Sequence, residues 1–190
     1  DSLLFSALIR PKLSPQHWAM LPLMTVVAVQ DALELLGIGS ARIKWPNDLL
    51  VDGKKISGIL CELSSEGTEL SYAVLGVGLN VNTPLEDMPK EIHDIACSMT
   101  SVCGHRFELK EVLDLILNRI EYWLELSVND DFESEREQWN ERNCTIGQFV
   151  TLDNGPSQVS GEAVGIADSG ALMLKDEQGK VHTIFSGDLH

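Results

Sequence analysis

The hydrophobic and polar positions of the first 37 residues change from a strand pattern to a helix pattern. Leu3–Ile9 is an apolar, β-competent run that Pro11 interrupts, which predicts a strand followed by a turn. From Ser14, a candidate N-cap, apolar residues recur at helical spacing as far as Gly37, a C-terminal stop signal. Pro22 marks either a kink or the true first turn. The pattern predicts a strand and then a long helix.

The strand period returns after residue 40. The pattern predicts strands over Ala41–Trp45, Leu49–Val51, Lys55–Leu63 and Glu69–Val81. Asp52-Gly53 separates the second of these from the third and is well suited to a tight hairpin turn. We therefore expect a central sheet after the first helix.

The rest of the chain predicts two helices and then a second set of strands. Apolar residues of Leu109–Leu124 lie on one helical stripe, and Asp131–Asn140 continues as a short, highly charged helix with a solvated face. After Thr145, short strands alternate with turn signals such as Asp168-Ser169-Gly170, which indicates a small all-β barrel. We expect one domain over residues 1–144 and a second over residues 145–190.

Composition narrows the class of function. The chain has 190 residues, with 14 basic and 29 acidic side chains and a formal net charge of −15. Binding to nucleic acid or to an anionic membrane needs clustered lysine and arginine side chains, so this balance argues against both. No apolar run approaches the ~20 residues that span a bilayer, and the chain does not open on a signal-peptide pattern. A small-molecule enzyme and a protein-binding module both remain.

The cysteines and histidines indicate free thiols and no local metal site. The five histidines supply no local pair with metal-ligand spacing. The four cysteines form no CxxC pair and lie in apolar or ordinary polar stretches, as reduced thiols do; they are Cys61, Cys97, Cys103 and Cys144. We expect a cytoplasmic location.

The densest cluster of unusual residues precedes the predicted hairpin. Arg42–Asp48 lies immediately before it, and the far strand opens with Lys54–Leu60, so two lysine-bearing segments come side by side. Pro46 cannot sit inside a central strand, so it turns the chain and presents Asn47 and Asp48 at the end of the sheet. The glycine at position 58 removes a side chain where a ligand or another backbone could approach.

A third segment, Gly76–Asn80, ends the last predicted strand of the sheet. It lacks the third glycine of GxGxxG because position 81 is Val81, and no helical pattern opens after it, so a Rossmann dinucleotide site is excluded. The chain also lacks a GxxxxGK[ST] phosphate loop.

Two interpretations of these segments stay open from the residues alone. Lys44 and Lys55 could stabilise a phosphate or carboxylate, or could be strand-edge charges that discourage aggregation. Asn47 and Asp48 could bind a ligand or form a turn, and Asn80 could merely close a strand.

The three segments together resemble a known family. Lys44–Asp48, Gly53–Glu62 and Gly76–Asn80 are similar, in order and spacing, to the signature series of the biotin protein ligases. The resemblance extends over Leu109–Trp139 and to the C-terminal strands with Gly187-Asp188-Leu189. It implies an α+β fold of the class II synthetase type, a mixed β-sheet with helices on one side, followed by a small SH3-like barrel.

The resemblance also implies a two-step reaction. The carboxylate of biotin attacks the α-phosphate of ATP in the presence of Mg²⁺ and gives biotinyl-5′-AMP and pyrophosphate. A lysine on the biotin carboxyl carrier domain of a carboxylase then takes the biotinyl group. Lipoate ligation, in a related family, and a non-catalytic biotin- or carrier-binding module are the alternatives.

Site residues follow from the matching motifs. Lys55 matches the lysine that contacts the biotin carboxyl and the phosphate, and its charge is expected to be catalytic. Lys44, Asn47 and Asp48 match the neighbouring motif, and Asp48 is the candidate for organising Mg²⁺ or the lysines. The remaining matches are biotin-pocket and adenylate positions: Gly58, Leu60, Gly78, Leu79, Asn80 and Ala96.

One departure from the family pattern concerns the start of the chain. The glycine- and arginine-rich GRGRxxRxW loop that folds over the adenylate in the family has no counterpart after Asp1. We expect the 190 residues to be part of a longer ligase rather than a short non-catalytic protein. No DNA-binding segment is visible in this chain, and a homodimer through a sheet edge remains open.

Overall fold

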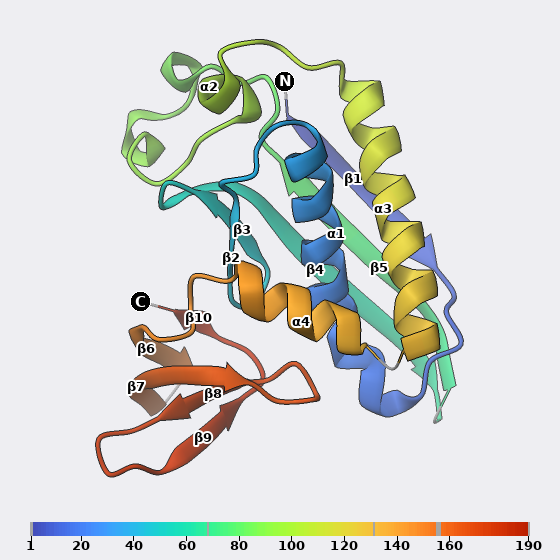
Figure 1. Cartoon of the computed structure of the whole chain (residues 1–190), viewed down its shortest axis with the longest axis vertical. Helices are drawn as coiled ribbons and strands as arrows, with labels where there is room; N and C mark the ends of the chain where they lie inside the picture. The colour runs from blue at the N-terminus through green and yellow to red at the C-terminus, as the bar shows by residue number, and fades with distance from the viewer. Residues whose placement is uncertain (1, 68, 131, 155–156, 190) are drawn as a thin grey trace.

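The computed structural model describes residues 2–67, 69–130, 132–154 and 157–189. These residues form two β-sheets and a layer of helices (Figure 1). The first sheet contains β1 (Leu3–Ile9), β2 (Arg42–Lys44), β3 (Asp48–Val51), β4 (Lys54–Glu66) and β5 (Glu69–Leu79). The second contains β6 (Phe149–Asn154), β7 (Ser157–Ile166), β8 (Leu172–Lys175), β9 (Val181–Ile184) and β10 (Asp188–Leu189). The main helices are α1 (Leu21–Leu35), α2 (Met99–Cys103), α3 (Leu109–Asp130) and α4 (Glu133–Arg142).

The first sheet has the strand order β1-β5-β4-β3-β2, and its named strands pair antiparallel. Parallel contacts are recorded as isolated bridges, Ile43 with Asn143 and Lys55 with Ala96. Helices α1, α3 and α4 lie on one face of the sheet (Figure 1). The α+β class with helices on one side of the sheet is therefore confirmed, and among the described residues the parallel contacts are these two bridges.

Alternation along the strands separates a helix-facing side from an open side. On β5, Ala73, Leu75, Val77 and Leu79 are buried in the core, whereas the residues between them face the other way. On β1, Leu4 is 78% exposed and pairs with Gly78 on β5. Where β1 meets β5, the open face of the sheet thus carries an exposed apolar side chain beside a glycine.

Helix α1 is the centre of the core and is preceded by a 3₁₀ helix. Pro15–Met20 forms a 3₁₀ helix, and the α-helix starts at Leu21 with Pro22 in its first turn. Ser14 is the N-cap of the 3₁₀ helix, and Pro22 marks the true first turn of the α-helix, one of the two alternatives that the sequence left open, because the missing N–H of proline costs nothing in a first turn. The predicted stop is confirmed, since Gly37 has φ +91°.

The same segment corrects one expectation about membranes. His17–Leu35 has the length and apolar composition of a membrane-spanning helix, although the sequence pattern led us to expect no such run. In the fold, 67% of that window is buried inside the protein. The central helix of a hydrophobic core meets the same length and composition criteria, so this feature is accounted for by core packing.

Helices α3 and α4 cover α1 and are held to it by polar contacts. Trp123 on α3 donates its indole N–H to Asp31 Oδ2 on α1 at 3.1 Å, and Arg119 forms an ion pair with the same carboxylate. Helix α4 begins at Glu133, whereas the sequence placed its start at Asp131, a residue outside the described ranges.

The second sheet has the order β10-β6-β7-β8-β9 with antiparallel pairing, as the turn signals after Thr145 predict. Its inner side is made of Leu152, Leu172, Leu174 and Ile184, all at most 7% exposed. A side chain at Gly161 would collide with the backbone of Lys175 and Asp176, so only glycine lets β7 approach β8 this closely.

Candidate functional site

The β3–β4 hairpin creates an ion pair on the open face of the sheet. Asp52 and Gly53 adopt φ +50° and +77°, the left-handed conformations that a two-residue turn of this type requires. The turn folds β4 back on β3, so that Asp48 pairs with Gly58 and the side chain of Lys55 reaches Asp48. Lys55 Nζ lies 2.6 Å from Asp48 Oδ1, and the two side chains are 48% and 25% exposed.

Gly58 provides the space for this ion pair. A Cβ atom at position 58 would lie 3.0 Å from both Cε and Nζ of Lys55 and 3.2 Å from Asp48 Oδ1. Contacts this short are tighter than ordinary van der Waals separation, so a side chain at 58 would displace the lysine. The glycine that the sequence singles out therefore lets a cation lie across the strand.

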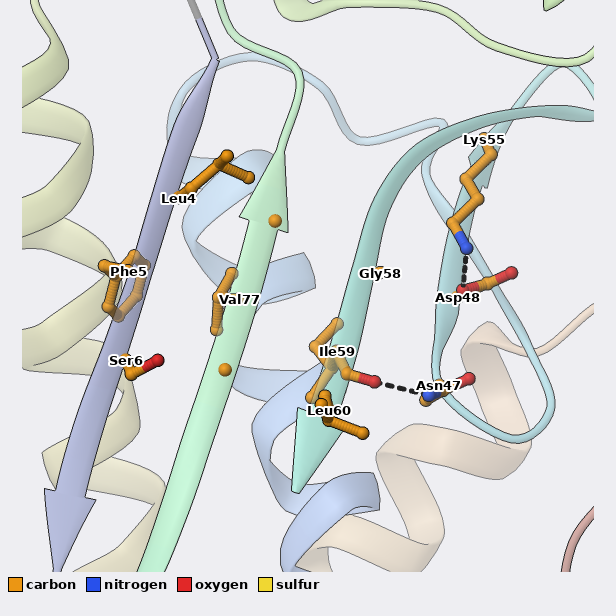
Figure 2. Close-up of a pocket in the computed structure, with 12 residues that line it drawn as sticks. Leu4, Phe5, Ser6, Asn47, Asp48, Lys55, Gly58, Ile59, Leu60 and Val77 are labelled. Carbon is orange, nitrogen blue, oxygen red and sulfur yellow. Dashed lines mark hydrogen bonds and ion pairs between the residues drawn. The ribbon is translucent and has the colours of Figure 1, made fainter. Parts of the chain in front are cut away.

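Around the pair lies a cleft of about 750 Å³ (Figure 2). Cross-strand pairing sets Gly58 beside Gly78 and Leu60 beside Gly76, so the floor carries little side-chain bulk. Leu60 is 62% exposed although it lines the cleft. Its lining residues come from four strands and the β2–β3 turn: Leu4, Phe5, Ser6, Asn47, Asp48, Lys55, Gly58, Ile59, Leu60, Gly76, Val77 and Gly78. The site is shallow, has little side-chain bulk on its floor and is charged at one end.

Asn47 holds the edge of this cleft to β4. Its Nδ2 donates to the carbonyl oxygen of Ile59, and the Ile59 amide donates to the Asn47 carbonyl at 2.9 Å (Figure 2). The turn that carries Asn47 includes a cis Trp45–Pro46 peptide bond. Asn47 and Asp48 thus lie at the end of the sheet, as Pro46 led us to expect.

A second pocket of about 400 Å³ adjoins the first at Lys55. Four residues line both: Leu4, Lys55, Gly58 and Gly78. Its far side is formed by Asn80 and by Ile92, Ile95 and Ala96. The Lys55 amide donates to Ile95 O at 2.8 Å, and the Cys97 amide donates to Lys55 O at 3.0 Å. The lysine is therefore held by its backbone to one wall and extends its amino group toward the other pocket.

Asn80 is fixed by hydrogen bonds on both sides of the second pocket. Its Nδ2 donates to Cys97 O at 3.0 Å, and its backbone amide donates to Ile56 O at 2.9 Å. Ser2 Oγ donates to Asn80 Oδ1 at 3.4 Å. The Asn80 side chain is therefore oriented by the fold, which is more than the closing of a strand requires.

Two residues of the predicted set lie outside both pockets. Lys44 Nζ donates to Leu189 O at 3.2 Å, across the junction with the second sheet. Leu79 is fully buried in the hydrophobic core. The structure brings together the other predicted positions: Asn47, Asp48, Lys55, Gly58, Leu60, Gly78, Asn80 and Ala96.

Sequence reasoning missed the lining residues that carry no distinctive chemistry. Leu4 and Ser6 reach the cleft because β1 pairs with β5 on its open side. Ile92 and Ile95 lie in a segment without long helix or strand, and no sequence period indicates where they point. The exposed alternate positions of β1 are a signal that could have identified Leu4.

No cluster in the described part of the chain resembles a dedicated metal centre. Within residues 2–67, 69–130, 132–154 and 157–189, no group of three or more His, Cys, Asp or Glu side chains could hold a metal ion. Asp48 is the acidic residue among the lining of the two pockets.

The cysteines remain free thiols, as their spacing predicts. Burial, with a smaller effect of the Glu62 charge, raises the pKa of Cys61 to about 11. Burial also raises the pKa of Cys97, which lies beside the second pocket, above its ordinary value. A thiolate nucleophile is therefore disfavoured here, and Lys55 is the charged group at the centre of the site.

Family models match two parts of the chain. Residues 1–80 match the biotin/lipoate A/B protein ligase family, and residues 145–189 match the biotin protein ligase C terminal domain.

Two sequence relatives match at least 90% of this chain. The bifunctional ligase/repressor BirA of Bacillus spizizenii is 32% identical over 184 residues, which cover 97% of this chain and 56% of the relative. The biotin--[acetyl-CoA-carboxylase] ligase of Paracoccus denitrificans is 31% identical over 175 residues, covering 90% of this chain and 73% of the relative. The chain thus spans little more than half the length of the Bacillus relative.

Solved structures agree with the sequence matches. The apo biotin protein ligase from Aquifex aeolicus superposes with a TM-score of 0.86 at 30% identity, covering 100% of this chain and 82% of that one. The same ligase in complex with biotin and ATP gives a TM-score of 0.83 at 30% identity, covering 100% and 77%.

Proposed function

Because the chain belongs to the biotin protein ligase family, we propose that it takes part in the ATP-dependent ligation of biotin to a lysine of a biotin carboxyl carrier domain. The reaction passes through biotinyl-5′-AMP. The observation that carries the proposal is the place of Lys55, whose side chain lines two adjoining pockets of different character. The larger pocket has a glycine floor with room for the ring system of biotin, and the smaller pocket suits the nucleoside of an adenylate.

The proposed binding arrangement follows the pocket linings. Biotin lies over the glycine floor of the larger cleft, against Leu60, with its carboxylate toward Lys55. The adenylate nucleoside occupies the smaller pocket beside Asn80 and Ala96. Gly58 and Gly78, which line both pockets, leave space for the bond that joins the two halves.

Chemistry at the junction needs a fixed positive charge. In the first step a carboxylate oxygen of biotin bonds to the α-phosphorus of ATP, and the bond to the β-phosphate oxygen breaks and releases pyrophosphate. In the second step the acceptor lysine amine attacks the biotinyl carbonyl, and AMP leaves. Lys55 stabilises the negative charge that develops on the α-phosphate in both steps, because a preorganised cation costs little reorganisation during reaction.

Asp48 has two proposed tasks. Its carboxylate holds the Lys55 amino group at 2.6 Å over Gly58, which restricts the lysine before substrates bind. Mg²⁺ supplies neutralisation of phosphate charge, and it is commonly held by one or two carboxylates together with substrate phosphates. Asp48 is the carboxylate at the junction that fits this pattern.

The remaining assignments are proposals of the same kind. Lys44 acts at the junction with the second sheet, where it donates to Leu189 O. Leu79 acts near the nucleoside by backbone contact only, since its side chain is buried. Residues 1–144 form the catalytic domain and residues 145–190 the C-terminal one, and the free thiols suit a cytoplasmic location.

Pyrophosphate release from the purified complete protein tests the proposal. Release that requires both ATP and biotin, and that fails when lipoate replaces biotin, is the expected result. Release with lipoate alone would assign the chain to lipoate transfer instead. Biotin binding by calorimetry without release, in the presence of a competent acceptor domain, would indicate a non-catalytic binding module and contradict the proposal.

A further inference from the structure

The segment Lys44–Asp48 divides its side chains between two places. Asn47 and Asp48 line the larger cleft, whereas Lys44 reaches the second sheet at Leu189. Trp45 follows Lys44 in the sequence, precedes the two cleft residues and is 2% exposed. The contacts of Trp45 show whether it only packs in the core or also links the second sheet to the residues of the cleft.

Trp45 is bonded to the second sheet and to the segment that leads into it. Its indole Nε1–H donates to the carbonyl of Gly170, in the β7–β8 turn, at 3.3 Å. Its backbone N–H donates to Thr145 Oγ1 at 2.9 Å. Both contacts join residues at least 100 positions apart in the sequence. The direction of the indole is therefore fixed by tertiary contacts.

The Gly170 carbonyl is itself held in place. Gly170 has φ +78°, and a Cβ atom there would overlap Leu23 Cδ1 and lie 3.1 Å from Met20 Sδ. The turn is closed by the Gly170 amide donating to Ala167 O at 2.8 Å. The β7–β8 turn thus lies against the start of α1 (Figure 1), and its carbonyl is a rigid acceptor for the indole.

On its other side, Trp45 leads directly to the cleft. Two residues further on, Asn47 exchanges hydrogen bonds with Ile59, and the next residue, Asp48, holds Lys55. We propose that Trp45 is a positioning residue, through which the β7–β8 turn of the second sheet fixes Asn47 and Asp48 and thereby the amino group of Lys55. This inference rests on the proposed ligase function and adds to it a specific route from the second sheet to the reacting end of the cleft.

The chain offers a matched control for the indole hydrogen bond. Trp123 is also buried, at 6% exposure, and donates one indole hydrogen bond, to Asp31 Oδ2 at 3.1 Å. That bond joins α3 to α1 in the helix layer, and Trp123 lines neither pocket. Trp45→Phe and Trp123→Phe therefore each remove an indole N–H from a buried position. Only Trp45 is connected to the cleft, through Asn47 and Asp48.

The first test measures adenylate formation. Trp45→Phe is expected to lower kcat/KM for biotin-dependent pyrophosphate release by between about threefold and about tenfold, the range of one lost hydrogen bond. Trp123→Phe is expected to leave kcat/KM unchanged at a comparable loss of Tm. In the double variant with Asp48→Asn, Trp45→Phe is expected to add little further loss, because it acts through Asp48. Losses that multiply, or equal losses in the two tryptophan variants, would overturn the proposal.

The second test uses ligand-free protein and does not depend on activity. Hydrogen exchange of the Ile59 amide, which donates to Asn47 O, is compared with that of the Asn80 amide, which donates to Ile56 O. Trp45→Phe and Thr145→Val are expected to speed Ile59 exchange at least about threefold relative to Asn80, and Trp123→Phe to leave the ratio unchanged. Thr145→Val keeps the indole and serves if Trp45→Phe does not fold.

The two tests separate the possible failures. If the wild-type protein releases no pyrophosphate, the proposed function fails, while the exchange ratio still decides whether Trp45 fixes Asn47. If release occurs and the exchange ratio is the same in all variants, Trp45 is a core residue and the positioning role is wrong.

Discussion

The amino group of Lys55 lies 2.6 Å from a carboxylate oxygen of Asp48, over the backbone of Gly58. The pair is partly exposed, and such ion pairs contribute about 0–1 kcal/mol to stability. Its significance lies in orientation, since it points a flexible lysine at the junction of two pockets. The proposed chemistry depends on that orientation.

Asp48→Asn should separate orientation from stability. The amide keeps the size of the side chain but removes the charge that holds Lys55, so the rate of pyrophosphate release should fall by about tenfold or more, as small misplacements of reacting groups do. The Tm should change little. An unchanged rate would show that Lys55 is positioned by other groups.

Gly58→Ala should weaken biotin binding. The added Cβ would lie 3.0 Å from Lys55 Nζ, so the amino group must move away from the place where it meets the biotin carboxylate, and a loss of ~1 kcal/mol there is about fivefold in Kd. Calorimetric titration with biotin measures it. Gly39→Ala is the control, because a Cβ there would meet only Glu34 Cγ at 4.0 Å. Equal affinities for the two variants would contradict the assigned floor of the cleft.

Ala96→Leu should affect the nucleotide more than biotin. Ala96 lines the smaller pocket only, and a larger side chain would occupy part of its volume of about 400 Å³. The KM for ATP should rise by about tenfold, while the Kd of biotin measured without ATP stays near the wild-type value. A selective loss of biotin affinity would contradict these assignments and indicate that biotin binds in the smaller pocket.

Cys61 should resist alkylation at neutral pH. Burial raises its pKa to about 11, so the protonated thiol dominates in the folded protein until the pH approaches that value. Iodoacetamide labelling, resolved by peptide mass spectrometry, should accelerate as the pH rises from 8 to 11. In denaturant, where the thiol recovers its ordinary pKa, labelling should already be faster near pH 9. Rapid labelling of folded protein at pH 7 would contradict this.

Local patterns were sufficient for the elements that position the ion pair. Asp52-Gly53 predicts the hairpin, and the hairpin alone brings Lys55 beside Asp48. Strand alternation could also have placed Leu79 correctly, because it continues the buried series of Ala73, Leu75 and Val77 on β5. The family resemblance assigned Leu79 to the adenylate site, whereas its side chain is buried in the core.

The destinations of Lys44 and Trp45 could not be predicted from local pattern. Both side chains contact groups more than 120 positions away, Leu189 and Gly170, on a sheet whose placement depends on the whole fold. The late start of α1 is a different case, since Pro15 and Pro22 each fit a first turn and the sequence did not decide between them.

Pyrophosphate release by Lys55→Ala and Lys110→Ala tests the central claim most directly. Lys110 is an exposed lysine paired with Asp114 on α3, at 2.5 Å, so the two variants remove equivalent charges at different places. We predict that Lys55→Ala lowers biotin- and ATP-dependent release by about a hundredfold to a thousandfold at unchanged Tm, as loss of one charge-stabilising group does. Lys110→Ala should match the wild type. Wild-type release by Lys55→Ala would contradict the account.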